Sequence, residues 1–481
     1  MKNIFLFLAS CFLADFIIAQ NVGIGTAIPA EKLHVIGNIQ TDTIKTNTVK
    51  IVTNAGVGKI LASDAEGNGG WQNNNAIGSG GSVGYGSWGD CSVNNIGEYN
   101  PVADVTGATQ DIFGNSVSVS GTYAIIGAPG DDVGPNANQG SASIFQFNGT
   151  NWIFIQKIID GFGAAGDAFG SSVCISGDYA IVGSYLDDVG AALDQGSVSI
   201  YQLTGSNWIL KNKLSDPTGT ANDNLGETVS IAGNYAVAGE PADDVGANTN
   251  QGSVLIFQLS AGNWSILNKI NDVSGQPNDF FGASVGLATT YLIVGIQGDD
   301  VFANINQGSA NIYQLSGGIW GFMQKITDAS GLANDFFGYS VAISGSSAIV
   351  GSYQDDVGAN SNQGSALIFN LIGGSWLLSQ KIVEPSTVGV AFGFFGKSVA
   401  ISGNYAIIGA DGDGITDYNA VTIYTHIGMG WQNVQYFKDP GANRFDLFGT
   451  SVTVDGTTKR FLIGAPAFAG GFGKALFGKI N

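Results

Sequence analysis

The chain has 481 residues, of which 44% are hydrophobic, 73 are glycine and only 12% are charged. This length suits two or three ordinary domains or one large repeat array, and the composition is typical of many short strands joined by tight turns. The formal net charge of −20 argues against nucleic-acid binding, because such a surface repels phosphate backbones. Histidine-based catalysis and histidine-rich metal sites are also disfavoured, since His34 and His426 are the only histidines.

Residues 1–19 are typical of a secretory signal peptide. Lys2 is followed by an apolar run, and Ala19 provides a small residue before a cleavage site. We therefore expect a secreted or outer-surface protein. The alternative is lipoprotein processing, because the run Leu8-Ala9-Ser10-Cys11 resembles a lipobox. No later segment reaches the ~18 uninterrupted apolar residues of a membrane-spanning helix, so no membrane span is expected.

Residues 20–72 differ in character from the rest of the chain. The segments 21–26, 31–35 and 37–39 resemble the stalk modules of exported bacterial and phage tail-fibre-like proteins. This resemblance implies a small β-rich stalk that often forms homo-oligomers. Residues 73–93 are rich in Asn, Gly and Ser and are predicted to form a linker. After signal removal Cys91 and Cys174 remain, and we expect two free thiols rather than a disulfide.

From residue 111 onward the sequence repeats about every 56 residues. The clearest mark is a pair of an aromatic or leucine residue and a glycine, at 113–114, 169–170, 225–226, 281–282, 337–338, 395–396 and 448–449. A second glycine follows each pair, beginning with Gly127, and a tryptophan recurs near the end of six repeats, beginning with Trp152. The tryptophans are expected to pack on outer strands, with sugar stacking as the alternative.

Each repeat predicts four strands, here named A to D in chain order. In the first repeat they are 116–119, 123–126, 141–147 and 152–158, separated by turn residues. Four antiparallel strands form one blade, and blades arranged around an axis cover each other's edges. Residues 94–481 are therefore predicted to be an all-β, seven-bladed β-propeller.

The two ends of the repeat region are predicted to close the ring. The last repeat stops after its third strand, at 474–480, and lacks a strand D. The segment 98–104 has the register of a strand D, so we expect it to complete the last blade. Pro101 is acceptable there because strand D is an edge strand.

These repeats resemble the FG-GAP repeat, the blade unit of integrin α-subunit propellers and of many exported bacterial proteins. Phe113-Gly114 and Gly127-Ala128-Pro129 carry the two signatures, and Gly464-Ala465-Pro466 matches the second one fully. The resemblance implies an extracellular binding platform. The family's calcium loops lie between strands A and B, but here that turn is short, as in Ser120-Gly121-Thr122, so this calcium site is not carried over.

The B–C loops and the D–A links emerge at one end of the blades and are rich in aspartate. We call this end the loop face. Its ligand-binding candidates are the paired acids of the B–C loops, Asp131, Asp132, Asp187, Asp188, Asp243, Asp244, Asp299, Asp300, Asp355 and Asp356. They could bind cations or basic ligands, or they could cap turns. Recurrence in five blades favours turn capping, because a single ligand site breaks the symmetry. Lysines such as Lys157 are expected on strand D, at the outer rim.

The sixth blade carries a different acidic loop. Asp411, Asp413 and Asp417 place three carboxylates within one short segment and are a candidate Ca²⁺ site, since calcium favours oxygen ligands in flexible loops. The spacing differs from that of an EF-hand. Apart from this possible calcium ion, no cofactor is expected.

Three functions remain open from the sequence. The first is an exported, non-enzymatic binding protein that recognises an extracellular protein or glycan, for example in cell adhesion. The second is a secreted polysaccharide-acting enzyme with paired carboxylates near the propeller axis. The third is a structural fibre component, in which the stalk is the key element.

Overall fold

A computed structural model describes residues 100–480 except 105, 385–390, 413–418, 429 and 439–445, together with the backbone of four short strands nearer the N-terminus. Contacts divide the chain into two units, residues 1–83 and 84–481. The predicted signal peptide lies outside the described residues, as does the predicted linker beyond residue 73. Within the described part, no helix combines the length and apolar character needed to cross a bilayer.

The N-terminal unit contains two small strand pairs. Strand β1 (Val22–Ile24) pairs in parallel with β2 (Leu33–Val35), and β3 (Lys59–Ser63) pairs antiparallel with β4 (Gly69–Asn73). The stalk function and its oligomerisation stay predictions.

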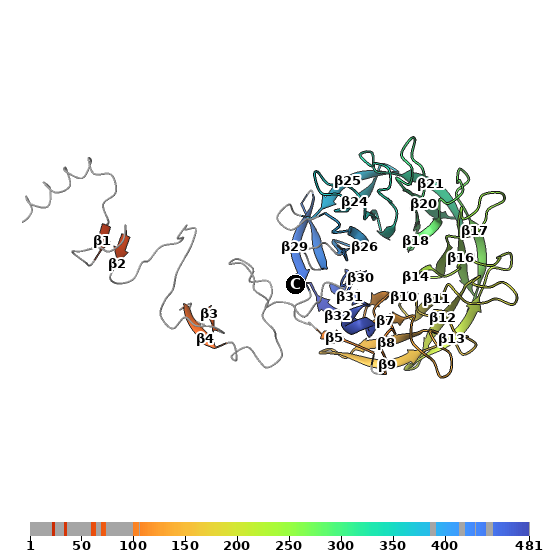
Figure 1. Cartoon of the computed structure of the whole chain (residues 1–481), viewed down its shortest axis with the longest axis horizontal. Helices are drawn as coiled ribbons and strands as arrows, with labels where there is room; N and C mark the ends of the chain where they lie inside the picture. The colour runs from red at the N-terminus through yellow and green to blue at the C-terminus, as the bar shows by residue number, and fades with distance from the viewer. Residues whose placement is uncertain are drawn as a thin grey trace, which may run out of the picture. The chain divides into compact units, whose positions relative to one another are not determined.

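The second unit is a ring of seven four-stranded antiparallel sheets (Figure 1), which confirms the predicted propeller. Blade 1 contains β6 (Val117–Ser120), β7 (Tyr123–Ala128), β8 (Ser141–Phe147) and β9 (Trp152–Ile158). Blades 2 and 3 contain β10 (Ser172–Ser176), β11 (Tyr179–Ser184), β12 (Ser197–Thr204), β13 (Asn207–Leu214), β14 (Thr228–Ala232), β15 (Tyr235–Glu240), β16 (Ser253–Ser260) and β17 (Asn263–Ile270). Blades 4 and 5 contain β18 (Phe281–Leu287), β19 (Tyr291–Ile296), β20 (Ser309–Ser316), β21 (Ile319–Ile326), β22 (Ser340–Ser344), β23 (Ser347–Ser352), β24 (Ser365–Ile372) and β25 (Ser375–Val383). Blade 6 contains β26 (Phe395–Ser402), β27 (Tyr405–Ala410), β28 (Ala420–Ile427) and β29 (Gly430–Lys438).

Blade 7 joins the two ends of the propeller sequence. It contains β30 (Ser451–Asp455), β31 (Arg460–Ala465), β32 (Lys474–Lys479) and, as its outer strand, β5 (Asn100–Val102). The antiparallel register pairs Ala475 with Val102 and Phe477 with Asn100. Ring closure by an N-terminal strand is thus confirmed, although the strand ends at Val102, before the predicted limit. The short helix α2 (Phe468–Gly471) lies in the B–C loop of this blade.

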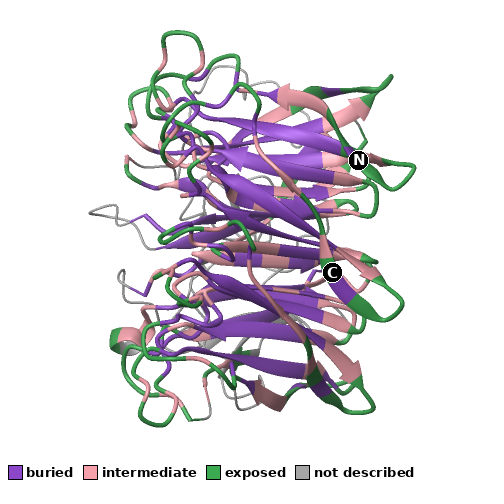
Figure 2. Cartoon of the chain, turned by 90° about the vertical axis from the view of Figure 1, so that its right-hand side faces the viewer, coloured by how far each residue is buried: buried purple, intermediate pink, exposed green. Residues whose placement is uncertain are grey.

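The hydrophobic core lies between blades rather than within one. One cluster joins Ile125 and Ile144 of blade 1 to Phe169 and Val182 of blade 2, and similar clusters recur around the ring. Figure 2 shows the buried strands crossing the propeller, with the exposed segments gathered at its two ends. A blade cannot bury its faces alone, so each one is stabilised by its two neighbours.

Two recurring glycines allow the blades to approach closely. A Cβ on Gly127 would lie 1.9 Å from the carbonyl oxygen of Gly170 in the next blade. Gly170 itself has φ +92, a left-handed conformation that side chains disfavour. Both signatures of the repeat therefore belong to the contact between neighbouring blades.

The recurring tryptophans are buried. Trp208, Trp264 and Trp376 are 1–2% exposed. Each packs edge-on against a tyrosine of the preceding blade. For Trp208 and Tyr123 the ring centroids are 5.5 Å apart. The packing interpretation of these residues is confirmed, and they offer no open face for stacking a sugar.

Candidate functional site

The two ends of the propeller differ in loop length. Strands A and B are joined by two-residue turns in blades 1 and 2, since Ser120 pairs with Tyr123 and Ser176 with Tyr179. The B–C loops and D–A links lie at the other end and are longer. This loop face carries the predicted ligand-binding aspartates.

The first aspartate of each B–C pair is buried and held by a lysine. Lys157 Nζ lies 2.5 Å from Asp131 Oδ2 and 2.9 Å from Asp104 Oδ2, and Asp104 lies on the link from the preceding blade. The arrangement recurs as Lys213 with Asp160 and Asp187, Lys269 with Asp216 and Asp243, Lys325 with Asp272 and Asp299, and Lys381 with Asp328 and Asp355. These lysines lie on strand D as expected, but their ammonium groups sit among loop-face carboxylates rather than pointing away at the rim.

The second aspartate of each pair caps its own loop. Asp132 Oδ1 accepts a hydrogen bond from the backbone N–H of Asn138 at 2.9 Å. The same contact joins Asp188 to Asp194, Asp244 to Asn250, Asp300 to Asn306 and Asp356 to Asn362. These side chains are exposed, yet each has a local structural role of the kind that Asp plays in turns.

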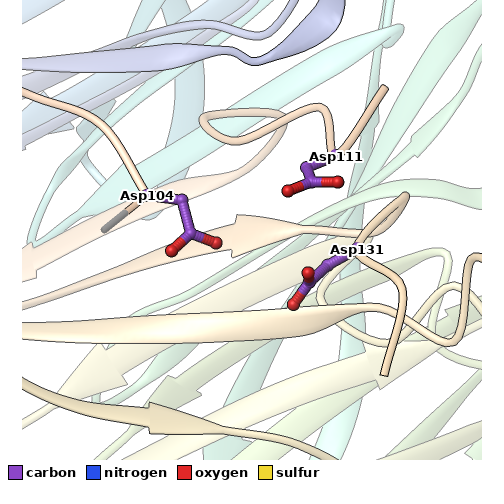
Figure 3. A group of neighbouring side chains, drawn as sticks. All are labelled: Asp104, Asp111 and Asp131. Carbon is purple, nitrogen blue, oxygen red and sulfur yellow. The ribbon is translucent and has the colours of Figure 1, made fainter. Parts of the chain in front are cut away.

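A third carboxylate joins each lysine-bound pair. In Figure 3, Asp104, Asp111 and Asp131 converge from the link, the end of the link and the B–C loop of blade 1. Their oxygens lie within 4.8 Å of one another, as do those of Asp160, Asp167 and Asp187. This geometry would suit a cation, but the lysine ammonium supplies the positive charge. Burial, opposed by a hydrogen bond from the Ala108 N–H, raises the pKa of Asp111.

Blade 6 breaks this pattern. Tyr436 pairs with Thr422 where Lys157 pairs with Ser143, so the blade has no lysine at that position. Asp411 instead contacts Lys397 Nζ at 3.1 Å through Oδ2 and accepts a hydrogen bond from Thr450 Oγ1. Asp413 and Asp417 lie outside the described residues, so the three-aspartate calcium site stays a prediction.

The innermost strands surround a cavity of about 280 Å³ at the start of strand A in all seven blades. Three consecutive residues of each blade line it in a ring, and the third is always a valine, as Val117 is in blade 1. The second position always carries a hydroxyl side chain, and these tie neighbouring blades together: Ser172 Oγ donates to the Gly226 carbonyl at 2.6 Å, and Ser451 Oγ donates to the Gly114 carbonyl at 2.8 Å. The hydroxyl position is therefore structural.

The first position of the ring differs in every blade. Around the axis it carries Asn115, Ser171, Glu227, Ala283, Tyr339, Lys397 and Thr450. These seven residues were not among the sites predicted from the sequence. The sequence does contain a pattern that marks them. The residue directly after each repeat pair of an aromatic or leucine residue and a glycine varies, while the next residue is always Ser or Thr.

Two charged residues lie on nearly opposite sides of this cavity, in blades 3 and 6. The carboxylate of Glu227 has no hydrogen-bond or ion-pair partner in the described part of the chain. Its side chain is open to solvent in the cavity, yet the surrounding protein displaces enough water to raise the pKa of its carboxyl group. The ammonium group of Lys397 forms an ion pair with Asp411. Burial raises the pKa of Tyr339, with smaller contributions from Asp411 and Glu227.

The protein is thus a closed seven-bladed β-propeller with lysine–aspartate ion pairs that recur in five blades and an axial cavity whose lining differs from blade to blade. The family model for the FG-GAP repeat matches residues 103–145, 152–201, 208–257, 264–313, 320–369 and 376–425, which together make up more than half of the chain. The protein belongs to the FG-GAP repeat family.

Comparison with solved structures finds a crystal structure of a putative 6-phosphogluconolactonase from Bacteroides fragilis. It has a TM-score of 0.44 and 11% sequence identity over 68% of this chain and 84% of that chain. No curated protein matches the chain in sequence.

Proposed function

We propose that this protein is exported and binds an extracellular ligand through the loop face of its propeller, without catalysing a reaction. Membership of the FG-GAP family supports this function, because the repeat builds extracellular binding platforms in integrin-like proteins. The N-terminal segment, which is typical of a secretory signal, supports secretion or display at the outer cell surface.

The asymmetric ring of the axial cavity is the observation that carries the proposal. Positions required by the fold recur in blade after blade, as the glycines and the hydroxyls do. The ring position after the glycine differs in each blade and opens into a cavity. A position that varies from blade to blade and lines a solvent-accessible cavity can form a ligand site on an otherwise symmetric scaffold.

Exposed apolar side chains on the loop face also support binding. Phe302, in a B–C loop, and Val273, on a D–A link, are fully exposed, and Phe162 is 83% exposed. Side chains exposed in this way are available for apolar contacts with a ligand.

The residues that line the cavity favour a binding protein over an enzyme. Most glycoside hydrolases use a pair of carboxylates on either side of the scissile bond. Among the described residues that line the cavity, Glu227 is the only carboxylate, and the nearby Asp411 is held by Lys397.

The test compares two double variants of the full mature chain on an array of glycans and extracellular proteins. Val273→Ser with Phe302→Ser alters the loop face, whereas Ile319→Ser with Ile372→Ser makes similar changes at exposed apolar positions of the opposite end. We expect the first variant to lose about tenfold in affinity for the ligand and the second to bind like the unaltered protein. Equal loss in both, turnover of a glycan, or no ligand on the array would contradict the proposal.

A further inference from the structure

Aromatic side chains outside the core gather beside the axial cavity in one sector of the ring. Tyr339 lines the cavity, and its ring lies 4.3 Å from that of Tyr353 in the B–C loop of the same blade. Tyr353 also contacts Phe336 at 5.8 Å and Phe394 of blade 6 at 5.7 Å. All four side chains are partly exposed. A continuous aromatic surface thus runs from the cavity onto the loop face.

This aromatic surface is specific to blades 5 and 6. The position of Tyr353 holds Pro129, Pro241, Gln297, Asp411 and Pro466 in blades 1, 3, 4, 6 and 7. Blade 2 has Tyr185 there, but the positions of Phe336, Tyr339 and Phe394 around it hold Ala168, Ser171 and Asn224. The fold does not require this aromatic cluster, since five blades lack an aromatic residue at the position of Tyr353 and blade 2 lacks its aromatic neighbours. The aromatic surface therefore needs an explanation beyond blade packing.

Polar groups of both kinds face the same cavity. Glu227 offers a carboxylate without a partner among the described residues, and Lys397 offers an ammonium with donors left after its contact with Asp411. Asp411 is not among the lining residues but contacts Lys397; it is 3% exposed, and its Oδ1 has no hydrogen-bond partner in the part of the chain that the structure describes. The hydroxyl side chains that bond to the neighbouring blades and one valine of each blade complete the lining.

These features fit one class of ligand. A sugar ring has an apolar C–H face that stacks on aromatic rings, and its hydroxyl groups both donate and accept hydrogen bonds. An anion is disfavoured because the one lysine of the cavity is already paired with Asp411. A cationic side chain would meet Glu227 but would also meet Lys397 on the other side. The cavity, at about 280 Å³, has room for one ring rather than for an oligosaccharide.

We propose that the axial cavity binds a terminal sugar ring of a carbohydrate ligand, with Tyr339 and Tyr353 as the stacking wall and Glu227 and Lys397 as hydrogen-bonding partners for the hydroxyl groups. This inference rests on the proposed function, because it names the ligand class of the same loop face. The rest of the glycan leaves the cavity across Phe336 and Phe394.

The experiment measures binding of a panel of neutral and N-acetylated monosaccharides, and of a lysine-rich peptide, to the full mature chain by titration calorimetry. The variants are Tyr339→Ala and Glu227→Ser, since blades 4 and 2 carry Ala283 and Ser171 at the same ring position. The control is Phe322→Ala, an exposed aromatic side chain on β21 away from the cavity. Thermal unfolding followed by circular dichroism checks that each variant is folded.

We expect at least one monosaccharide to bind, and both cavity variants to weaken it about tenfold while Phe322→Ala leaves the affinity unchanged. A sugar bound equally by all variants, but lost in the Val273→Ser, Phe302→Ser variant, would overturn the cavity inference and leave loop-face binding intact. Binding of the peptide alone, weakened by Glu227→Ser, would overturn the carbohydrate assignment. If the array shows no ligand at all, the proposed function fails, and the inference fails with it.

Discussion

In each of five blades, one lysine side chain contacts an aspartate of its own blade and an aspartate of the link from the preceding blade. Lys269 contacts Asp216 of the preceding link and Asp243 of its own blade, at 2.6 and 2.8 Å. Although burial opposes it, the hydrogen bond from Lys269 lowers the pKa of Asp216 below its usual value. The third carboxylate of such a cluster has no lysine contact of its own. Desolvation by burial is therefore the largest effect on its pKa, which is raised.

This imbalance predicts a pH dependence of stability. Burial, helped by repulsion from Asp299 and Asp355, raises the pKa of Asp279 and of Asp335 to about 6. In the unfolded chain these groups titrate near ~3.9, so the folded state binds more protons between about pH 4 and pH 6. The free energy of unfolding should therefore fall as the pH rises through this window, by up to a few kcal/mol. Below about pH 4, stability should fall again as lysine-bound carboxylates such as Asp216 are protonated.

Urea denaturation at pH 4.5, 6 and 7.5 measures this dependence. The double variant Asp279→Asn, Asp335→Asn keeps an oxygen that accepts the backbone N–H of Gln276 or Leu332 but cannot ionise. Its loss of stability between pH 4.5 and 7.5 should be clearly smaller than that of the unaltered protein. The same slope in both proteins would show that these two carboxyl groups do not titrate in this range.

At the scale of the element, the glycine of each strand B sets how closely two blades can pack. A Cβ on Gly183 of β11 would lie 2.0 Å from the Gly226 carbonyl oxygen and 2.4 Å from Ser172 Oγ. Ser172 donates a hydrogen bond to that same carbonyl, so the three groups form one inter-blade contact. Any side chain larger than hydrogen must separate the blades or bend a strand.

Gly183→Ala is therefore expected to cost about 3 kcal/mol of unfolding free energy through overpacking. Gly321→Ala is the matched control, because Gly321 also lies in a strand, β21, and a Cβ there meets no atom within 4 Å. The control should change stability by less than about 1 kcal/mol. Chemical denaturation of both variants gives the two values, and a similar small effect in both would refute the close-packing argument.

Across the whole molecule, three kinds of contact join neighbouring blades, although blade 6 lacks the lysine of the second kind. Hydroxyl groups bond to glycine carbonyls near the axis, lysine–aspartate pairs lie on the loop face, and side-chain amides bond to tryptophan backbones at the rim, as Gln324 does with Trp376 at 2.8 Å. Blade 7 is completed only when β5 pairs with β32. Asp104, just after β5, also binds Lys157 of blade 1.

Removal of the closing strand should weaken the whole ring. A chain that starts at residue 84 keeps β5, whereas one that starts at residue 106 lacks both β5 and Asp104 and leaves β32 as an open edge. We expect the shorter chain to melt lower by roughly 5 °C or more and to aggregate. Thermal unfolding and light scattering compare the two, and a synthetic peptide of residues 94–105 should restore stability in part. Identical melting would contradict closure by this strand.

The strands, the blade count and the closing strand could all be predicted from the amino-acid sequence. These features depend on local alternation, turn residues and a regular spacing, all of which can be read along the chain, as at Phe113-Gly114 and at the missing last strand. The sequence also indicated that recurring aspartates such as Asp132 cap turns, and the contacts on the loop face are of that kind.

Contacts between residues far apart in the sequence could not be predicted in this way, because they depend on how the blades pack. Lys213 reaches Asp160 of the preceding link, 53 positions earlier, because neighbouring blades stack at that point. The ring that contains Glu227, Tyr339 and Lys397 forms because seven inner strands converge on one axis. The varying position after each aromatic-glycine pair is visible in the sequence, but nothing along the chain shows that these seven residues meet, since each belongs to a different repeat and they come together only in the closed ring.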